Sequence, residues 1–142
     1  MKTFKLKSLV IIDNKDKNMV KHNIELIDGL IINREDEESL WVIEAYTSNA
    51  NYAYLKSVQE NKNEVIIEVK ITKETNAPVF FLTSIIGLNN INDNMNVLFK
   101  GTIINQQKSR TEELLKKLID QGYEGEELFS LFKQQMRTKN NS

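Results

Sequence analysis

Histidine and cysteine, which supply most catalytic dyads and structural metal sites, are nearly missing from this chain. His22 is the single histidine, and the sequence contains no cysteine. A zinc site or a nucleophile–base pair built on His22 would need nitrogen or sulfur partners that the chain lacks. His22 also alternates with Val20 and Ile24, as an ordinary strand residue does. We therefore predict no catalytic or metal-binding role for it, and no cofactor.

Two polar runs have the oxygen-rich composition of calcium loops. Residues 35–38 are acidic, but no glycine there allows the turn that such a loop needs. Asn90, Asn92 and Asn94 have the alternate spacing of an EF-hand, yet Met95 stands at its glycine position and Gly101 at its final glutamate. No phosphate-binding glycine motif and no G-x-S-x-G is present. No pair of carboxylates is singled out either, so the sequence predicts a non-enzymatic protein.

Three tyrosines are the remaining candidates for ligand recognition: Tyr46, Tyr52 and Tyr54. Aromatic side chains displayed on a barrel face can stack on the bases of single-stranded nucleic acid, provided that a basic groove lies beside them. Lysines for such a groove are available at Lys5, Lys7, Lys56, Lys70 and Lys100. The alternative is that the tyrosines pack against neighbouring strands.

The composition describes one globular domain. The chain has 142 residues, of which 40% are hydrophobic and 27% charged, and its net charge is −1. This charge balance gives no general attraction to nucleic acid or to an anionic membrane. The longest N-terminal apolar run, residues 9–12, is too short for a signal peptide or a membrane span. We expect a cytoplasmic protein.

Most of the chain has the alternating pattern of β-strands. Expected strands cover residues 3–12, 20–26, 30–33, 40–47, 52–58, 64–72, 77–86 and 95–104. A change of phase near Lys7 and Ser8 predicts a β-bulge. The pair Asp28–Gly29 lies between apolar runs and predicts a hairpin turn. About eight short strands favour a single antiparallel β-barrel over a sandwich.

Residues 109–137 are the one strongly helical stretch. Ser109 and Glu112 have the spacing of a capping box, and Gly122 is placed to end a first helix. A second helix is expected to begin at Gly125. The apolar stripes of the two helices are Leu114, Leu115, Leu118 and Ile119, and then Leu128, Phe129, Leu131, Phe132 and Met136. Helices this short are marginal alone in water, so the pair is expected to dock on the barrel or on a partner.

The expected organisation is a mainly β protein with a C-terminal α part. Residues 1–106 form the barrel core, residues 107–138 the two-helix pair, and residues 139–142 a frayed tail.

The chain as a whole resembles the YwpF-like proteins of Gram-positive bacteria. The resemblance is carried by the opening Met-Lys-Thr-Phe-Lys-Leu-Lys-Ser-Leu, the strand-rich body and the closing Glu-Glu-Leu-Leu-Lys-Lys-Leu-Ile-Asp-Gln-Gly-Tyr. It implies a β-barrel followed by a two-helix pair. It also implies a barrel similar to the tube proteins of type VI secretion, which is an analogy of fold. The family carries no established activity and no functional residues to transfer.

Two hypotheses of function follow. In the first, the barrel is a scaffold for a protein partner or for self-assembly, and the helix pair offers the contact surface through Phe129, Met136, Leu115 and Ile119. The width of both apolar stripes supports it, since it exceeds the roughly 100° of one buried face. In the second, the face around the three tyrosines binds a small ligand or single-stranded nucleic acid.

Overall fold

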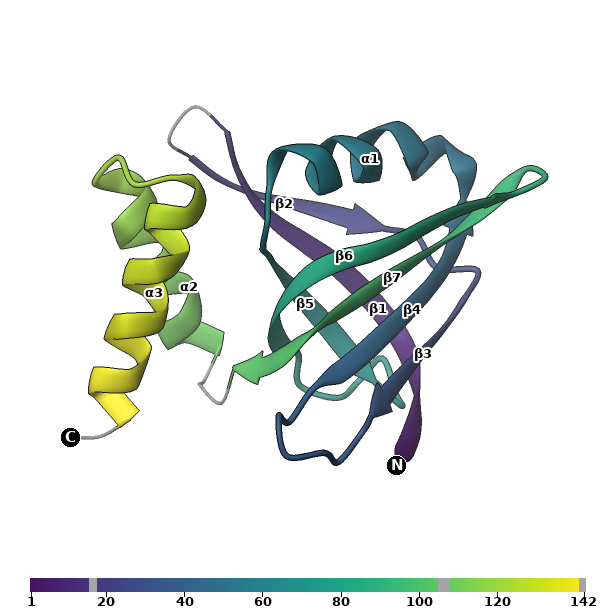
Figure 1. Ribbon diagram of the computed structural model, residues 1–142, viewed down its shortest axis with the longest axis horizontal. Helices are drawn as coiled ribbons and strands as arrows, with labels where there is room; N and C mark the ends of the chain where they lie inside the picture. The colour runs from purple at the N-terminus through teal and green to yellow at the C-terminus, as the bar shows by residue number, and fades with distance from the viewer. Residues whose placement is uncertain (16–17, 105–107, 141–142) are drawn as a thin grey trace.

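The computed structural model describes residues 1–15, 18–104 and 108–140, with side chains described for residues 1–13, 19–104 and 111–135 (Figure 1). The elements, in chain order, are β1 (Lys2–Lys15), β2 (Asn18–Ile24), β3 (Asp28–Asn33), β4 (Trp41–Ser48), the 3-10 turn η1 (Asn49–Asn51), α1 (Tyr52–Asn61), β5 (Val65–Ile71), β6 (Val79–Ile91), β7 (Asn94–Ile104), α2 (Lys108–Asp120) and α3 (Gly125–Asn140).

Six strands close into an antiparallel barrel in the order β1-β3-β4-β7-β6-β5, and β1 pairs with β5 to complete the ring. The long strand β1 makes this closure possible because its two halves have different neighbours. Its first residues, Lys2 to Lys5, pair with β3, and its second half pairs with β2 on one edge and β5 on the other. The register between β1 and β5 shifts between Leu6 and Ser8, which confirms the predicted bulge.

The prediction of about eight strands was wrong in number, although the barrel itself is confirmed. The barrel has six strands, and β2 lies outside it, paired with β1 alone. One expected strand, residues 52–58, is the helix α1 instead. The predicted hairpin at Asp28–Gly29 is absent from the described residues, because both residues belong to β3 and pair with β4.

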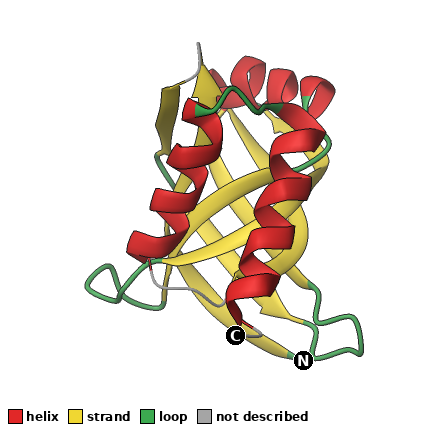
Figure 2. Ribbon diagram, turned by 90° about the vertical axis from the view of Figure 1, so that its left-hand side faces the viewer, coloured by secondary structure: helices red, strands yellow, loops and turns green. Residues whose placement is uncertain are grey.

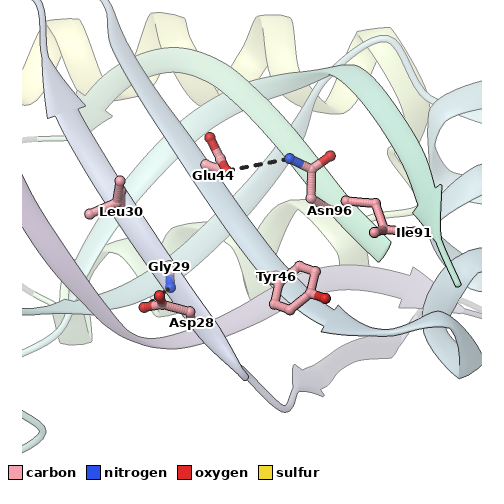
Figure 3. A pocket seen from close by; sticks show the side chains of 7 residues that line it. All are labelled: Asp28, Gly29, Leu30, Glu44, Tyr46, Ile91 and Asn96. Atoms are coloured by element: carbon pink, nitrogen blue, oxygen red, sulfur yellow. Dashed lines mark hydrogen bonds between the residues drawn. The ribbon is translucent and has the colours of Figure 1, made fainter. Parts of the chain in front are cut away.

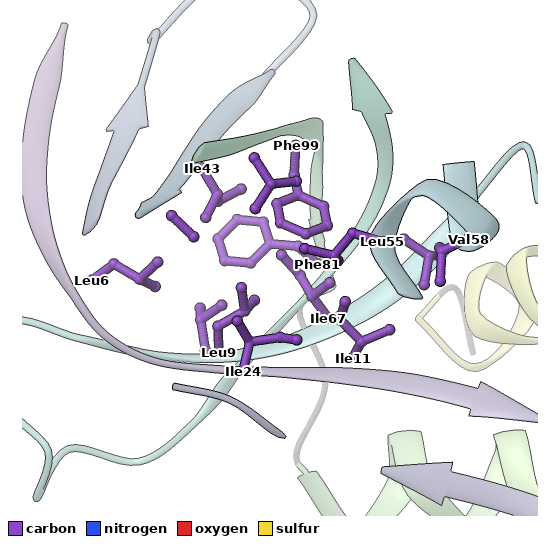
Figure 4. Close-up of a cluster of buried hydrophobic side chains, with 14 of the residues drawn as sticks. Leu6, Leu9, Ile11, Ile24, Ile43, Leu55, Val58, Ile67, Phe81 and Phe99 are labelled. Carbon is purple, nitrogen blue, oxygen red and sulfur yellow. The ribbon is translucent and has the colours of Figure 1, made fainter. Parts of the chain in front are cut away.

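Side chains fill the inside of the barrel (Figure 4). Each strand contributes residues that alternate inward, as the two-residue period of a strand requires. The fully buried inward residues include Leu9, Ile11, Ile31, Ile43, Ile67, Phe81, Val97 and Phe99. Trp41 packs edge-on against Phe81, with ring centroids 5.2 Å apart. The interior is therefore a packed core.

Helix α1 covers one end of the barrel, where β6 continues past its last pairing with β5. Ser48 begins the turn into the helix, since its hydroxyl accepts the backbone N–H of Ala50 at 3.2 Å. Leu55 and Val58, three residues apart, are buried in the barrel core. On one side Tyr54 reaches β1, and on the other Gln59 Nε2 donates to the Ile85 carbonyl of β6 at 3.4 Å.

The helix pair α2–α3 packs against the outer face of the barrel (Figure 2). A second apolar core forms there between both helices and Ile12, Ile66, Phe80 and Leu82 of β1, β5 and β6. The side chains of Leu114, Leu115, Leu118 and Ile119 are all buried in it. Because the barrel core lies on its other side, β5 is buried on both faces from Val65 to Val69.

A helix-ending glycine and ion pairs hold α2 and α3 in place on the barrel. α2 ends before Gly122, which adopts φ +93°, and the N–H of Tyr123 donates to the Leu118 carbonyl at 3.2 Å. Lys21 of β2 lies 2.6 Å from Glu112 of α2, and Lys133 of α3 lies 2.9 Å from Glu64. The side chain of Ser109, the predicted cap, lies outside the described residues.

Candidate binding site on the outer barrel face

The three candidate tyrosines lie in different surroundings. Tyr46 is on the outer face of β4, and its hydroxyl accepts Asn94 Nδ2 at 3.1 Å. Tyr52 and Tyr54 belong to α1 and pack against the barrel core. Lys56 of the same helix pairs with Glu60 at 3.8 Å. The arrangement forms no shared aromatic face with a lysine groove among the described residues.

Tyr54 anchors α1 to β1 and β2. Its ring stacks on His22, with centroids 3.9 Å apart, and its hydroxyl donates to Asp13 Oδ2 at 3.4 Å. Lys62 Nζ lies 2.5 Å from the other oxygen of Asp13. Burial, together with the negative charge and hydrogen bond of Asp13, raises the pKa of Tyr54 well above its ordinary value. A hydroxyl held protonated in this way acts as a structural donor.

The helix-pair candidates face inward. Leu115 and Ile119 of α2 and Phe129 of α3 are buried in the second core, at most 8% exposed. The side chain of Met136 lies outside the described residues. The described residues of both apolar stripes thus serve the docking on the barrel, and Leu115, Ile119 and Phe129 are not on the surface of the folded chain.

A pocket of about 200 Å³ lies on the outer face of β3, β4 and β7. The strand registers build it: Leu30 pairs with Glu44 on the next strand, and Asp28 pairs with Tyr46, which in turn pairs with Asn96. Gly29 and Ile91, the latter at the end of β6, complete the lining (Figure 3). We call this the β3–β4–β7 pocket.

Two carboxylates and two exposed apolar side chains border the β3–β4–β7 pocket. Glu44 Oε1 accepts Asn96 Nδ2 at 3.4 Å, and Asp28 Oδ1 accepts the N–H of Gly29 at 2.8 Å (Figure 3). Neither carboxylate forms an ion pair with any cation in the described part of the chain. Leu30 is 42% exposed and Ile91 46%. The pocket therefore offers negative charge beside apolar surface.

Other kinds of site are not formed by the described residues. Within residues 1–15, 18–104 and 108–140, no group of three or more histidine, aspartate or glutamate side chains is placed to hold a metal ion. No helix in those ranges is both long enough and apolar enough to cross a bilayer.

Sequence reasoning did not single out the β3–β4–β7 pocket, although one signal for it was present. Residues 41–47 alternate, so Glu44 and Tyr46 had to share the face opposite to Ile43 and Ala45. What alternation cannot give is the strand order. Only the pairing of β4 with both β3 and β7 brings Asp28 and Asn96 beside them.

Comparisons with known proteins agree on one family. The YwpF-like protein family matches residues 2–135. The uncharacterized protein YwpF of Bacillus subtilis (strain 168) is 33% identical over 138 residues, which are 96% of this chain and 100% of that protein. The crystal structure of a hypothetical protein from Staphylococcus aureus is similar with a TM-score of 0.67 and 34% identity, covering 98% of this chain and 95% of that one. This chain belongs to the YwpF-like family.

Proposed function

We propose that the protein is a non-enzymatic scaffold that binds another protein through the outer face of β3, β4 and β7. The observation that carries this proposal is the β3–β4–β7 pocket itself, which has an apolar side chain more than 40% exposed at each end, Leu30 and Ile91 (Figure 3). The barrel interior is filled, and the helix pair covers the face formed by β1, β5 and β6. Exposed apolar side chains that border a concave site are typical of protein-contact surfaces.

The same geometry does not favour the nucleic-acid alternative. Asp28 and Glu44 would repel a phosphate backbone, and no lysine or arginine lines the β3–β4–β7 pocket. Self-assembly is a second form of the scaffold proposal, in which the bound protein is another copy of this chain. The similarity to tube proteins of type VI secretion stays an analogy of fold, and the cytoplasmic location stays a prediction.

Site-specific photo-crosslinking in living cells tests the proposal. A benzophenone amino acid is placed at Leu30, at Ile91 and, as a matched control, at Ala53, which is exposed on α1. We expect one adduct of defined mass at Leu30 and Ile91 and none at Ala53. An adduct of twice the chain mass identifies self-assembly. If Leu30 and Ile91 give no protein adduct, or only those also formed at Ala53, the proposal is wrong.

A further inference from the structure

We propose that the β3–β4–β7 pocket receives the side chain of a lysine or arginine carried by an extended segment of the partner protein. This inference rests on the proposed function and gives the contact its chemistry. Asp28 and Glu44 each have one oxygen that accepts a hydrogen bond from this chain, at 2.8 Å and 3.4 Å. The second oxygen of each has no donor among the described residues. An incoming ammonium or guanidinium would supply that donor together with the opposite charge.

The apolar lining indicates an organic cation and not a metal ion. Calcium takes six to eight oxygen ligands, whereas Leu30, Ile91 and the ring of Tyr46 occupy much of this border. Lysine and arginine side chains combine an alkyl stem with a charged head. In the β3–β4–β7 pocket the stem would lie on the ring of Tyr46, and the head would reach the carboxylates of Asp28 and Glu44. Leu30 and Ile91 lie at opposite ends of the pocket (Figure 3), where the residues on either side of the basic side chain would contact them.

The size of the pocket points to one side chain. Sites for drug-sized ligands enclose roughly 300–1,000 Å³, and this pocket encloses about 200 Å³. Leu30 and Ile91 also keep exposed surface that a free amine would leave uncovered. A peptide backbone lying across the strands would cover that surface with the residues beside its basic side chain. The occupant that fits is therefore a protein segment with apolar residues near a lysine or arginine.

Amide NMR titration of the purified protein tests this chemistry. The probes are the peptide acetyl-Leu-Ala-Lys-Ala-Leu-amide, its arginine counterpart, a counterpart with neutral acetyl-lysine, and spermidine as a free polyamine. We expect the lysine and arginine peptides to shift the Gly29 N–H and the Asn96 side-chain amide saturably. We expect the acetyl-lysine peptide to bind at least tenfold more weakly. Equal binding of the acetyl-lysine peptide, or of spermidine, would overturn the inference.

Variants that remove one charge from the pocket provide a second test of this inference. Glu44→Gln and Asp28→Asn keep the size of each side chain, and Glu113→Gln changes an exposed carboxylate on α2. We expect about tenfold weaker binding of the lysine peptide for each of the first two variants and no change for Glu113→Gln. Wild-type affinity in both pocket variants contradicts the inference.

The photo-crosslink at Leu30 separates this inference from the proposed function. If its adduct persists at full yield in Glu44→Gln and Asp28→Asn, the contact surface stands and the basic side chain is wrong. If neither Leu30 nor Ile91 gives an adduct in the otherwise wild-type chain, the proposed function itself fails, whatever the peptides do.

Discussion

Phe80 and Phe81 are neighbours on β6 but belong to two different cores. Phe81 points into the barrel and is 0% exposed, while Phe80 points outward beneath the helix pair and is 1% exposed. The single strand β6 thus joins the barrel interior to the docking surface of α2 and α3. Each core can be weakened separately by changing one of these two rings.

Truncating either phenylalanine should destabilise the protein, with different consequences for Trp41. We expect Phe80→Ala and Phe81→Ala each to lower the free energy of unfolding by about 3–5 kcal/mol, measured by urea denaturation. Of these two phenylalanines, Phe81 is the one that packs against the ring of Trp41, so of the two variants only Phe81→Ala should change the near-ultraviolet circular dichroism of the native state. Phe80→Ala should instead speed proteolysis within α2 and α3. Equal spectral changes in both variants would contradict the two-core description.

Removing Lys21 should loosen the attachment of α2. Its ammonium lies 2.6 Å from Glu112 and 3.7 Å from Glu68, which is 9% exposed. We expect Lys21→Met to lower the free energy of unfolding by about 1–3 kcal/mol, since Glu68 stays buried without this cation. The matched control Lys116→Met, at an exposed position of α2, should change it by less than about 0.5 kcal/mol. Similar losses in the two variants would show that the ion pairs contribute little.

Gly101 should not tolerate alanine, whereas Gly87 should. A Cβ at Gly101 would lie 2.0 Å from the carbonyl oxygen of Leu82, and a backbone atom cannot turn aside. The corresponding Cβ at Gly87 would meet the flexible Leu98 side chain at 3.4 Å. We expect Gly101→Ala to lower the melting temperature sharply and the free energy of unfolding by more than about 2 kcal/mol. Gly87→Ala should change the free energy of unfolding by no more than about 1 kcal/mol. A melting temperature of Gly101→Ala close to wild type would refute the close approach of β6 and β7.

Alkaline pH should weaken the fold through Tyr54 and Lys21. Burial and Asp13 raise the pKa of Tyr54 above 10.0. Burial lowers the pKa of Lys21, but its hydrogen bond to Glu112 and the charges of Glu68 and Glu112 outweigh burial and raise it above 10.5. Both groups hold their protons more tightly in the folded state, so their stabilisation is present below pH 10 and is lost as pH rises above it.

The measurement for this pH dependence is the urea midpoint at pH 9 and pH 11. The urea midpoint should be lower at pH 11 than at pH 9 in the wild type, and this decrease should be smaller in Tyr54→Phe. The absorbance titration of the tyrosines should also lose a component above pH 10 in Tyr54→Phe. If the urea midpoint of Tyr54→Phe decreases as much as that of the wild type, Tyr54 does not contribute to the pH dependence.

Residues 52–58 show where strand prediction from the sequence failed. Tyr52, Tyr54 and Val58 fit an alternating pattern, yet Leu55 and Val58 also fit a helix. Ser48 caps the 3-10 turn η1 that leads into it. The helix forms because β6 parts from β5 beyond Thr83, which leaves a barrel end for Leu55 and Val58 to cover. That opening is a tertiary feature, and no local propensity reports it.

The prediction of a hairpin turn at Asp28–Gly29 failed for a related reason. Asp-Gly is a strong turn signal because glycine allows positive φ, but Gly29 is needed here for space. A Cβ at Gly29 would lie 2.8 Å from the side chain of Leu6 on the neighbouring strand β1. In contrast, Gly122 does adopt positive φ at the end of α2, as the sequence predicted. The same residue type served two purposes, and only the strand order distinguishes them.

The β3–β4–β7 pocket could not be found from the sequence, because it too depends on the strand order. Asp28 is separated from Asn96 by a long stretch of chain, and β4 alone joins their strands. The apolar stripe of α2 was easier to predict, because its residues follow one another within a single helix: Leu114, Leu115, Leu118 and Ile119.

The docking of the helix pair also bears on synthesis of the chain. The barrel strands are made before α2 and α3, so these two helices leave the ribosome after them. Until they arrive, Ile12, Ile66, Phe80 and Leu82 form an apolar patch on a barrel that is otherwise complete. Nascent chains stalled at this stage would be prone to aggregate or to recruit chaperones. By covering this patch, α2 and α3 would protect the newly made barrel from aggregation.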